Sequence, residues 1–103
     1  MIGIDIVEIS RISLRDAFVR KVLTPMEQEE YLQRTTEKQK KEYLAGRFAA
    51  KEAIFKATQD PAWLSFSVLN KENGQPYVYG RPDLQISISH DGGIAAAVVQ
   101  CSV

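Results

Sequence analysis

The chain has 103 residues, which is enough for one domain but not for two. Its 13 basic and 13 acidic side chains balance, which argues against nucleic acid as the main partner. No apolar run approaches the roughly 18 residues of a membrane span, and the first residues lack the pattern of a signal peptide. The single cysteine excludes an intrachain disulfide and suits a reducing compartment. We therefore expect one cytoplasmic domain, residues 1–103, with no membrane or nucleic-acid partner.

The first elements are predicted from hydrophobic spacing. Isoleucines alternate with other residues over positions 2–9, and this period of two predicts a strand. Residues 11–22 then change to a spacing of four, which predicts a helix. The apolar residues that carry this second pattern are Leu14, Phe18 and Val22.

Two capping motifs start the next helices. A start signal occurs at Thr24-Pro25-Met26-Glu27: the threonine can cap a helix, the proline suits the first helical position, and the glutamate completes a capping box. A short helix should therefore run to about residue 34. Thr36 and Gln39 repeat the capping pattern, and a longer helix is predicted from 37 to about 58. Asp60-Pro61 should end it.

The last third of the chain is predicted to be β-structure. Alternating apolar residues occur over 64–68, 84–88 and 94–99. Asn73-Gly74 is a strong hairpin signal, because both central residues of that turn need positive φ. The order of the predicted elements, one strand, three helices and then further strands, indicates an α+β fold: an antiparallel β-sheet with helices packed on one face.

Three charged side chains stand out because they lie among apolar or small residues. Asp5 is inside the first strand, and a carboxylate near a core is costly unless it is paired or bound to a metal. Glu52 and Lys56 are four residues apart and share one helical face. Two carboxylates from separate elements suit Mg²⁺, which keeps several waters for a bound phosphate. Two alternatives remain open: Asp5 caps a helix or pairs with an arginine, and Glu52 forms an exposed ion pair with Lys56.

Two further groups have both a functional and a structural interpretation. His90, the only histidine, ends a strand before a glycine-rich turn, so it either meets a ligand or hydrogen-bonds the turn. One histidine and one cysteine are too few for a zinc site. Arg11 and Arg15 are four apart on the predicted first helix, with Phe18 on the same side, and a basic face beside an aromatic ring suits an acidic protein partner. The alternative is a solvated helix face with Phe18 in the core.

Together these motifs resemble one family over essentially the whole chain. They are Gly3-Ile4-Asp5-Ile6-Val7 with Glu8, Arg11 and Ile12; Leu23-Thr24 with Glu27; Glu42-Tyr43-Leu44-Ala45-Gly46-Arg47-Phe48-Ala49-Ala50-Lys51-Glu52-Ala53 with Lys56-Ala57; and Ser87-Ile88-Ser89-His90. The chain is similar to the holo-[acyl-carrier-protein] synthases, the short single-domain branch of the 4′-phosphopantetheinyl transferases. The helical run is specific for this family by itself. The strand motif and the histidine motif indicate the family only in combination with the other motifs.

The resemblance implies a reaction and a metal. Members of the family move the 4′-phosphopantetheine arm of coenzyme A onto a serine of an apo-acyl carrier protein, and they release adenosine 3′,5′-bisphosphate. They require Mg²⁺, and by position Asp5 and Glu52 would hold the ion. Lys56 would meet the pyrophosphate of coenzyme A.

The resemblance also implies contacts with the nucleotide of coenzyme A. Arg47 and His90 would contact coenzyme A through its phosphates, and Gly74 and Pro76 match a Gly-x-Pro element that lies near the nucleotide. After Lys56 the family tends to continue into a turn that contains glycine, but residues 58–61 of this chain contain none.

Partners and assembly follow from the same resemblance. Arg11, with Arg15 and Phe18, would meet the acidic recognition helix of the carrier protein. The family is typically a homotrimer with its sites between subunits, and a chain this short can scarcely enclose coenzyme A by itself. Two other functions remain open from the residues: a non-catalytic module that docks acidic carrier domains, and a different Mg²⁺-dependent enzyme that acts on a nucleotide.

Overall fold

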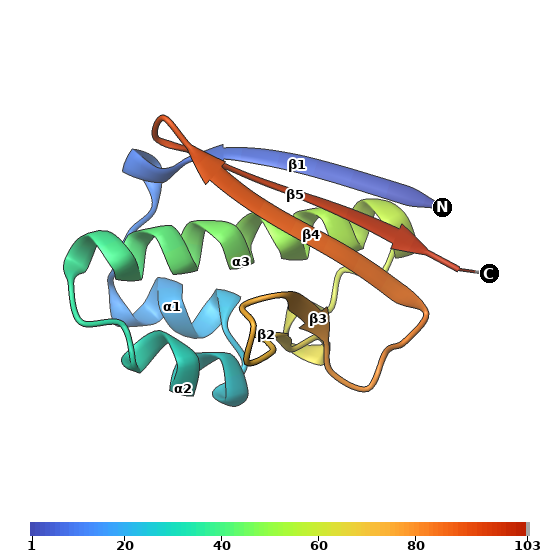
Figure 1. The fold of residues 1–103 in the computed structure, drawn as a ribbon, viewed down its shortest axis with the longest axis horizontal. Helices are drawn as coiled ribbons and strands as arrows, with labels where there is room; N and C mark the ends of the chain where they lie inside the picture. Colours follow the sequence, from blue (N-terminus) through green and yellow to red (C-terminus); the bar gives the residue numbers. More distant parts are fainter. Residues whose placement is uncertain (103) are drawn as a thin grey trace.

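Helix α3, Glu37–Thr58, is the central element of the protein, and two layers pack against its opposite sides. The structure is a computed structural model that describes residues 1–102. One layer is a three-stranded antiparallel sheet in the order β1-β5-β4 (Figure 1). Its strands are β1 (Ile2–Glu8), β5 (Ile94–Cys101) and β4 (Leu84–Asp91).

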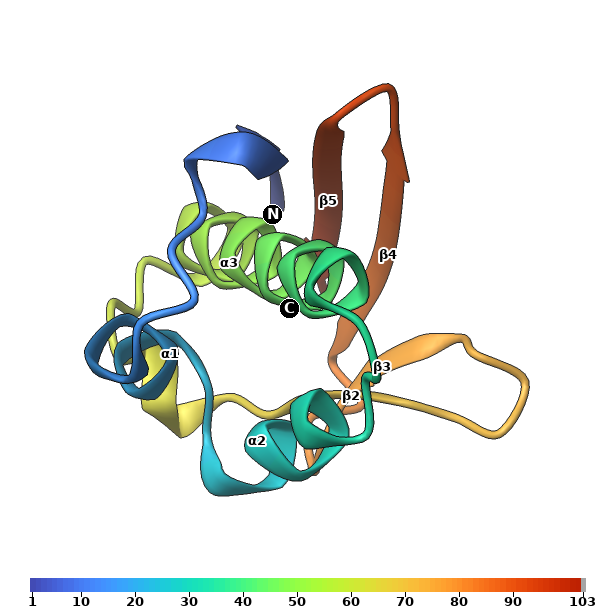
Figure 2. The same ribbon diagram turned by 90° about the vertical axis from the view of Figure 1, so that its left-hand side faces the viewer.

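The second layer lies on the other side of α3 and is smaller (Figure 2). It contains two short helices and a two-stranded antiparallel sheet of β2 and β3. Its elements are α1 (Asp16–Val22), α2 (Pro25–Leu32), β2 (Val68–Asn70) and β3 (Pro76–Val78), and the 3-10 turns of the chain are η1 (Ile9–Arg11) and η2 (Trp63–Ser65). The predicted α+β architecture, an antiparallel sheet with helices on one face, is confirmed. No helix within residues 1–102 is long and apolar enough to cross a membrane.

Strand β1 lies very close to α3 because one of its residues has no side chain. A Cβ atom added to Gly3 would collide with the carbonyl oxygen of Ala53 and would lie 2.9 Å from the backbone nitrogen of Ala57. Both alanines are buried in the core. Side chains two residues apart on a strand share a face, so this close packing also directs Asp5 toward α3.

The outer face of the three-stranded sheet exposes apolar side chains in a row. Ile2, Ile4 and Ile6 are 69%, 62% and 66% exposed, although isoleucine is normally among the most buried residues. In the sheet register, Ile4 lies beside Val98, whose strand β5 is the centre of the sheet. Contiguous exposed apolar side chains of this kind are a common feature of protein interfaces.

A buried ion pair connects α3 to the second layer. The ammonium group of Lys51 is 2.8 Å from Oε1 of Glu27, and both side chains are fully buried. Lys51 also donates to the backbone carbonyls of Val22, Trp63 and Phe66. Burial lowers the pKa of Lys51, while the carboxylate of Glu27 opposes that shift. The pair therefore fixes the middle of α3 relative to α2 and η2.

The sequence predicted most of these elements but not all of them. The capping box at Thr24 and the extent of α3 are confirmed. The predicted helix over 11–22 begins only at Asp16, because Ile12 and Arg15 have extended backbone and the Ser13 hydroxyl accepts a hydrogen bond from the backbone N–H of Arg15. The predicted strand over 64–68 is wrong, since Trp63–Ser65 forms a 3-10 turn and β2 begins at Val68.

Candidate active site

Two of the predicted site residues, Asp5 on β1 and Glu52 on α3, line the same cleft, although they are far apart in the chain. We call this hollow of about 590 Å³ the acidic cleft. Its walls are formed by Asp5, Ile6, Val7, Glu8, Arg11, Ile12, Phe18, Phe48, Glu52 and Ile94. The carboxylates reach it from different elements because the close approach at Gly3 brings β1 against the Glu52 side of α3.

Lys56, the third predicted catalytic residue, lies next to Asp5. Its ammonium group donates to the backbone carbonyl of Ile4 at 2.8 Å and is 3.4 Å from Oδ1 of Asp5. Within residues 1–102, Lys56 is paired with Asp5 and not with Glu52, its neighbour one turn earlier. About half of the Lys56 side chain is exposed, so the ammonium group can reach a ligand that enters the cleft.

The acidic cleft has a donor set that fits Mg²⁺. Within residues 1–102 no group of three or more histidine, cysteine, aspartate or glutamate side chains forms a cage for a metal ion. Mg²⁺ does not need such a cage, because it is usually bound by one or two carboxylates, waters and the phosphates of a substrate. Asp5 and Glu52 could therefore hold it beside a phosphate ligand.

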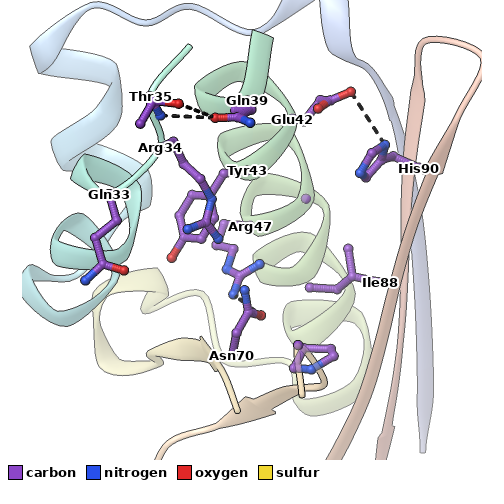
Figure 3. Close-up of a pocket in the computed structure, with 13 residues that line it drawn as sticks. Gln33, Arg34, Thr35, Gln39, Glu42, Tyr43, Arg47, Asn70, Ile88 and His90 are labelled. Carbon is purple, nitrogen blue, oxygen red and sulfur yellow. Dashed lines mark hydrogen bonds and ion pairs between the residues drawn. The ribbon is translucent and has the colours of Figure 1, made fainter. Parts of the chain in front are cut away.

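A second pocket gathers the residues predicted to bind the nucleotide. Arg47, Gly74, Pro76 and His90 all line one hollow of about 600 Å³, which we call the arginine pocket (Figure 3). Arg47 comes from α3, His90 from β4, and Gly74 and Pro76 from the hairpin of β2 and β3. Its other lining residues are Gln33, Arg34, Thr35, Gln39, Glu42, Tyr43, Gly46, Asn70 and Ile88.

Arg47 is held inside the wall of this pocket by the protein itself. Its Nε donates to the carbonyl of Val68 at 3.0 Å, and its Nη2 donates to Asn70 at 2.8 Å and to Glu30 at 3.3 Å. The guanidinium also lies 4.2 Å from the centre of the Tyr43 ring. Burial, helped by the hydrogen bond to Glu30, raises the pKa of Tyr43, so its hydroxyl stays protonated as a donor.

His90 faces the arginine pocket from the opposite wall. Its Nδ1 is 3.7 Å from a carboxylate oxygen of Glu42, and about half of its side chain is exposed (Figure 3). No hydrogen bond from His90 to the following turn is present within residues 1–102. The imidazole is therefore open to a ligand.

The acidic cleft and the arginine pocket lie on different sides of α3. Arg47 and Glu52 are five residues apart, which places them about 140° apart around a helix of 3.6 residues per turn. Asp5 and His90 are on β1 and β4, the two outer strands of the sheet, and β5 lies between them (Figure 2). One copy of the chain therefore presents the two halves of the predicted site in different directions.

The structure places the residues predicted to contact a protein partner in different positions. Arg11 and Phe18 line the acidic cleft, whereas Arg15 does not; it occupies the N-cap position of α1 without a side-chain capping hydrogen bond. Arg11 lies in η1, so the predicted arrangement of both arginines on one helix is wrong. Phe18 stacks on Phe48 with ring centres 5.9 Å apart.

Sequence reasoning missed two contributors to these sites. Phe48 packs between Phe18 and Trp63 at the edge of the acidic cleft, and its position in the apolar stripe of α3 was the signal for it. Arg34 lines the arginine pocket, but it follows the end of α2 without any motif that marks it.

The chain is similar to known proteins of one superfamily. Residues 1–99 match the family model of the 4′-phosphopantetheinyl transferase superfamily. The chain is 41% identical over 108 residues to a holo-[acyl-carrier-protein] synthase of Halalkalibacterium halodurans, covering 94% of this chain and 90% of that one. It is 39% identical over 111 residues to the Bacillus subtilis protein of the same name, covering 95% and 91%.

Solved structures give the same result. A crystal structure of a holo-(acyl-carrier-protein) synthase from Bacillus anthracis in complex with CoA (3′,5′-ADP) matches with a TM-score of 0.84 and 35% identity, over 99% of this chain and 96% of that one. The Helicobacter pylori protein in complex with coenzyme A matches with a TM-score of 0.81 and 32% identity, over 99% and 100%. The chain therefore belongs to the 4′-phosphopantetheinyl transferase superfamily.

Proposed function

We propose that the protein is a holo-[acyl-carrier-protein] synthase. It transfers the 4′-phosphopantetheine arm of coenzyme A to a serine of an apo-acyl carrier protein and releases adenosine 3′,5′-bisphosphate. Family membership over nearly the whole chain and relatives of this name support the reaction. The observation that carries the assignment of the site is the convergence of Asp5 on β1 and Glu52 on α3 at one cleft, with the ammonium group of Lys56 beside Asp5.

We propose that Asp5 and Glu52 hold Mg²⁺ in the acidic cleft. When bound, the ion would neutralise charge on the pyrophosphate of coenzyme A. Lys56 adds a flexible, half-exposed ammonium group at the same place, and this group stabilises the negative charge that grows on the leaving phosphate oxygen. The serine oxygen of the carrier attacks the phosphorus that bears the pantetheine arm, and the bond from that phosphorus to the leaving phosphate oxygen breaks. Catalysis by these residues is positioning plus electrostatics, as in other phosphoryl transfers.

The complete site is proposed to form between subunits of a homotrimer. The acidic cleft handles the pyrophosphate, and the arginine pocket, with Arg47, Gly74, Pro76 and His90, handles the nucleotide. Because the two face different directions in one chain, a neighbouring copy has to supply the second half. The exposed isoleucine row on β1 provides an apolar surface for that neighbour.

The carrier protein is proposed to dock beside the acidic cleft. Arg11 lies in the wall of the cleft, so it can attract an acidic helix and bring the carrier serine close to the reacting phosphorus. Phe18 offers an apolar contact at the same edge, and Arg15 is exposed at the start of α1. A cytoplasmic location is part of the proposal, since one unpaired cysteine suits a reducing compartment.

The test is the mass of the carrier protein after incubation with the protein, coenzyme A and Mg²⁺. A gain of one phosphopantetheine group, abolished by a chelator, is expected. Glu52→Gln removes one ligand charge without changing shape and should lower the rate at saturating Mg²⁺ by about 100-fold or more, a loss of several kcal/mol of transition-state stabilisation. Glu72→Gln, an exposed change in the β2–β3 hairpin, is the matched control.

Other outcomes of the same assay would select the other functions. Binding of the carrier with no change in its mass would indicate a docking module. Consumption of coenzyme A without the carrier would indicate a different nucleotide enzyme. Full activity of Glu52→Gln would refute the metal role of that carboxylate while leaving the transferase assignment in place.

A further inference from the structure

We propose that Glu30 of α2 is a positioning residue, which fixes the β2–β3 hairpin beside α3 and thereby sets the affinity for coenzyme A. The proposal rests on the function proposed above and adds a residue that lies outside both hollows. Glu30 does not line the arginine pocket. Its three hydrogen-bond partners do, and they are Tyr43, Arg47 and Asn70 (Figure 3). An effect of Glu30 on a ligand therefore acts through these partners.

The edge of β2 that faces away from β3 is bonded to side chains instead of to another strand. Backbone groups of alternate residues in an antiparallel pair point to opposite edges, so the N–H groups of Val68 and Asn70 share this edge. The N–H of Val68 donates to Oε2 of Glu27 at 2.7 Å, and the Val68 carbonyl accepts from Nε of Arg47 at 3.0 Å. The N–H of Asn70 donates to Oε2 of Glu30 at 2.9 Å. Charged side chains of α2 and α3 thus hold the hairpin in place.

Glu30 joins this edge to the wall of the arginine pocket. Its Oε1 accepts from the Tyr43 hydroxyl at 2.8 Å and from Nη2 of Arg47 at 3.3 Å. The same Nη2 donates to Oδ1 of Asn70 at 2.8 Å, so Glu30, Arg47 and Asn70 form a closed set of contacts between α2, α3 and β2. The Glu30 side chain is 20% exposed, so a substitution there leaves the core filled.

The contacts require a carboxylate at position 30, because each of its oxygens faces a group that can only donate. These groups are the Arg47 guanidinium and the backbone N–H of Asn70. Glutamine has the same shape as glutamate, but it presents one oxygen and one NH₂ group. Whichever way the amide turns, its NH₂ group faces one of the two donors, and that connection is lost. Glu30→Gln therefore loosens the hairpin without changing the volume of the side chain.

The consequence for the ligand follows from what the hairpin carries. Gly74 and Pro76 lie a few residues beyond Asn70 and line the arginine pocket with it. A loosened wall weakens binding of the molecule that the pocket takes. The transfer step takes place at the acidic cleft, on a different side of α3, so it does not depend on Glu30. An interaction that is equally strong in the ground state and the transition state changes KM and leaves kcat unchanged.

The experiment measures steady-state transfer to a carrier protein by the wild type, Glu30→Gln and Glu29→Gln. Glu30→Gln should raise KM for coenzyme A by about 10-fold and keep kcat within about 2-fold of the wild-type value. Glu29→Gln is the matched control, because it makes the same chemical change at an exposed residue of the same helix outside the pocket. This control should leave both constants unchanged.

Amide hydrogen exchange gives a second measurement that does not depend on turnover. In Glu30→Gln the amide protons of β2 should exchange about 10-fold faster than in the wild type, because the hairpin opens locally more often. The amide protons in the middle of α3 should exchange as in the wild type. A merely structural role of Glu30 would lower the stability of the whole fold and accelerate exchange in both elements.

Three results would overturn the positioning role of Glu30. They are a lower kcat with an unchanged KM, no change in either constant, and equal acceleration of exchange in β2 and α3. If the wild type modifies a carrier protein in these cases, the proposed function stands and only the role of Glu30 falls. If the wild type modifies no carrier, the proposed function falls, and the role of Glu30 in binding coenzyme A falls with it.

Discussion

A mixture of two inactive variants should regain activity if each site is shared between subunits. Glu52→Gln damages the acidic cleft, and His90→Glu places a second carboxylate beside Glu42 in the arginine pocket, where it repels phosphate. Each variant alone should be almost inactive. In a mixed trimer, one of the three interfaces joins an intact cleft to an intact pocket, so co-purified mixed trimers should show about one third of the wild-type rate.

The assay uses co-expression of the two variants with different affinity tags and purification over both. Transfer is followed by the mass of the carrier protein, and the homotrimers of each variant, mixed after purification, serve as the control. A site built within one chain predicts no recovery, because every chain then carries one damaged half. Absence of recovery in verified mixed trimers would therefore refute the shared site.

Three further predictions concern assembly and stability. Ile4→Glu, on the exposed isoleucine row, should give a folded monomer without transferase activity. Light scattering measures the oligomeric state and circular dichroism measures the folding of this variant, and a persistent trimer would contradict the prediction. Lys51→Met leaves the buried Glu27 without its cation and should cost about 3–5 kcal/mol in the free energy of unfolding; a loss below about 1 kcal/mol in urea titrations would show that the pair is dispensable. Gln59→Gly should stabilise the protein by about 0.5–1 kcal/mol, because Gln59 ends α3 with a positive φ of 63°; a lower melting temperature would argue against strain there.

The sequence predicted α3 closely because its limits are local. Thr36 caps its start, and Asp60-Pro61 prevents its continuation. The chain even lacks the expected glycine after Lys56, yet Gln59 adopts the left-handed conformation that such a turn requires. The backbone N–H groups of Gln59 and Asp60 donate to the Phe55 carbonyl and the Thr58 hydroxyl, so the turn forms without glycine, at a local cost that the sequence alone does not reveal.

One error of sequence prediction also has a local origin. The spacing of Leu14, Phe18 and Val22 fits a helix from residue 11, but the hydrogen bond from Arg15 to Ser13 delays its start. The sequence predicted that Asp5 and Glu52 lie together, because their residue types are unusual in their surroundings, and both line the acidic cleft. Arg34 was not predicted, because its place in the wall of the arginine pocket depends on its contacts with the Glu30 carbonyl and the Tyr43 ring, which no local pattern reports.

In the proposed homotrimer, the position of both proposed half-sites on one helix would explain how a chain this small acts on a large substrate. A rigid helix presents Glu52 and Arg47 about 140° apart, so a ligand that needs both cannot be enclosed by one copy. Rotational symmetry removes this restriction, because a ring of identical chains joins one side of each α3 to the other side of its neighbour. Such an interface joins two different surface patches of the chain. When the ring closes, every copy has both of its patches covered. An apolar row on β1 combined with a divided site is what this assembly requires, and a variant that breaks the ring should lose activity even with every site residue intact.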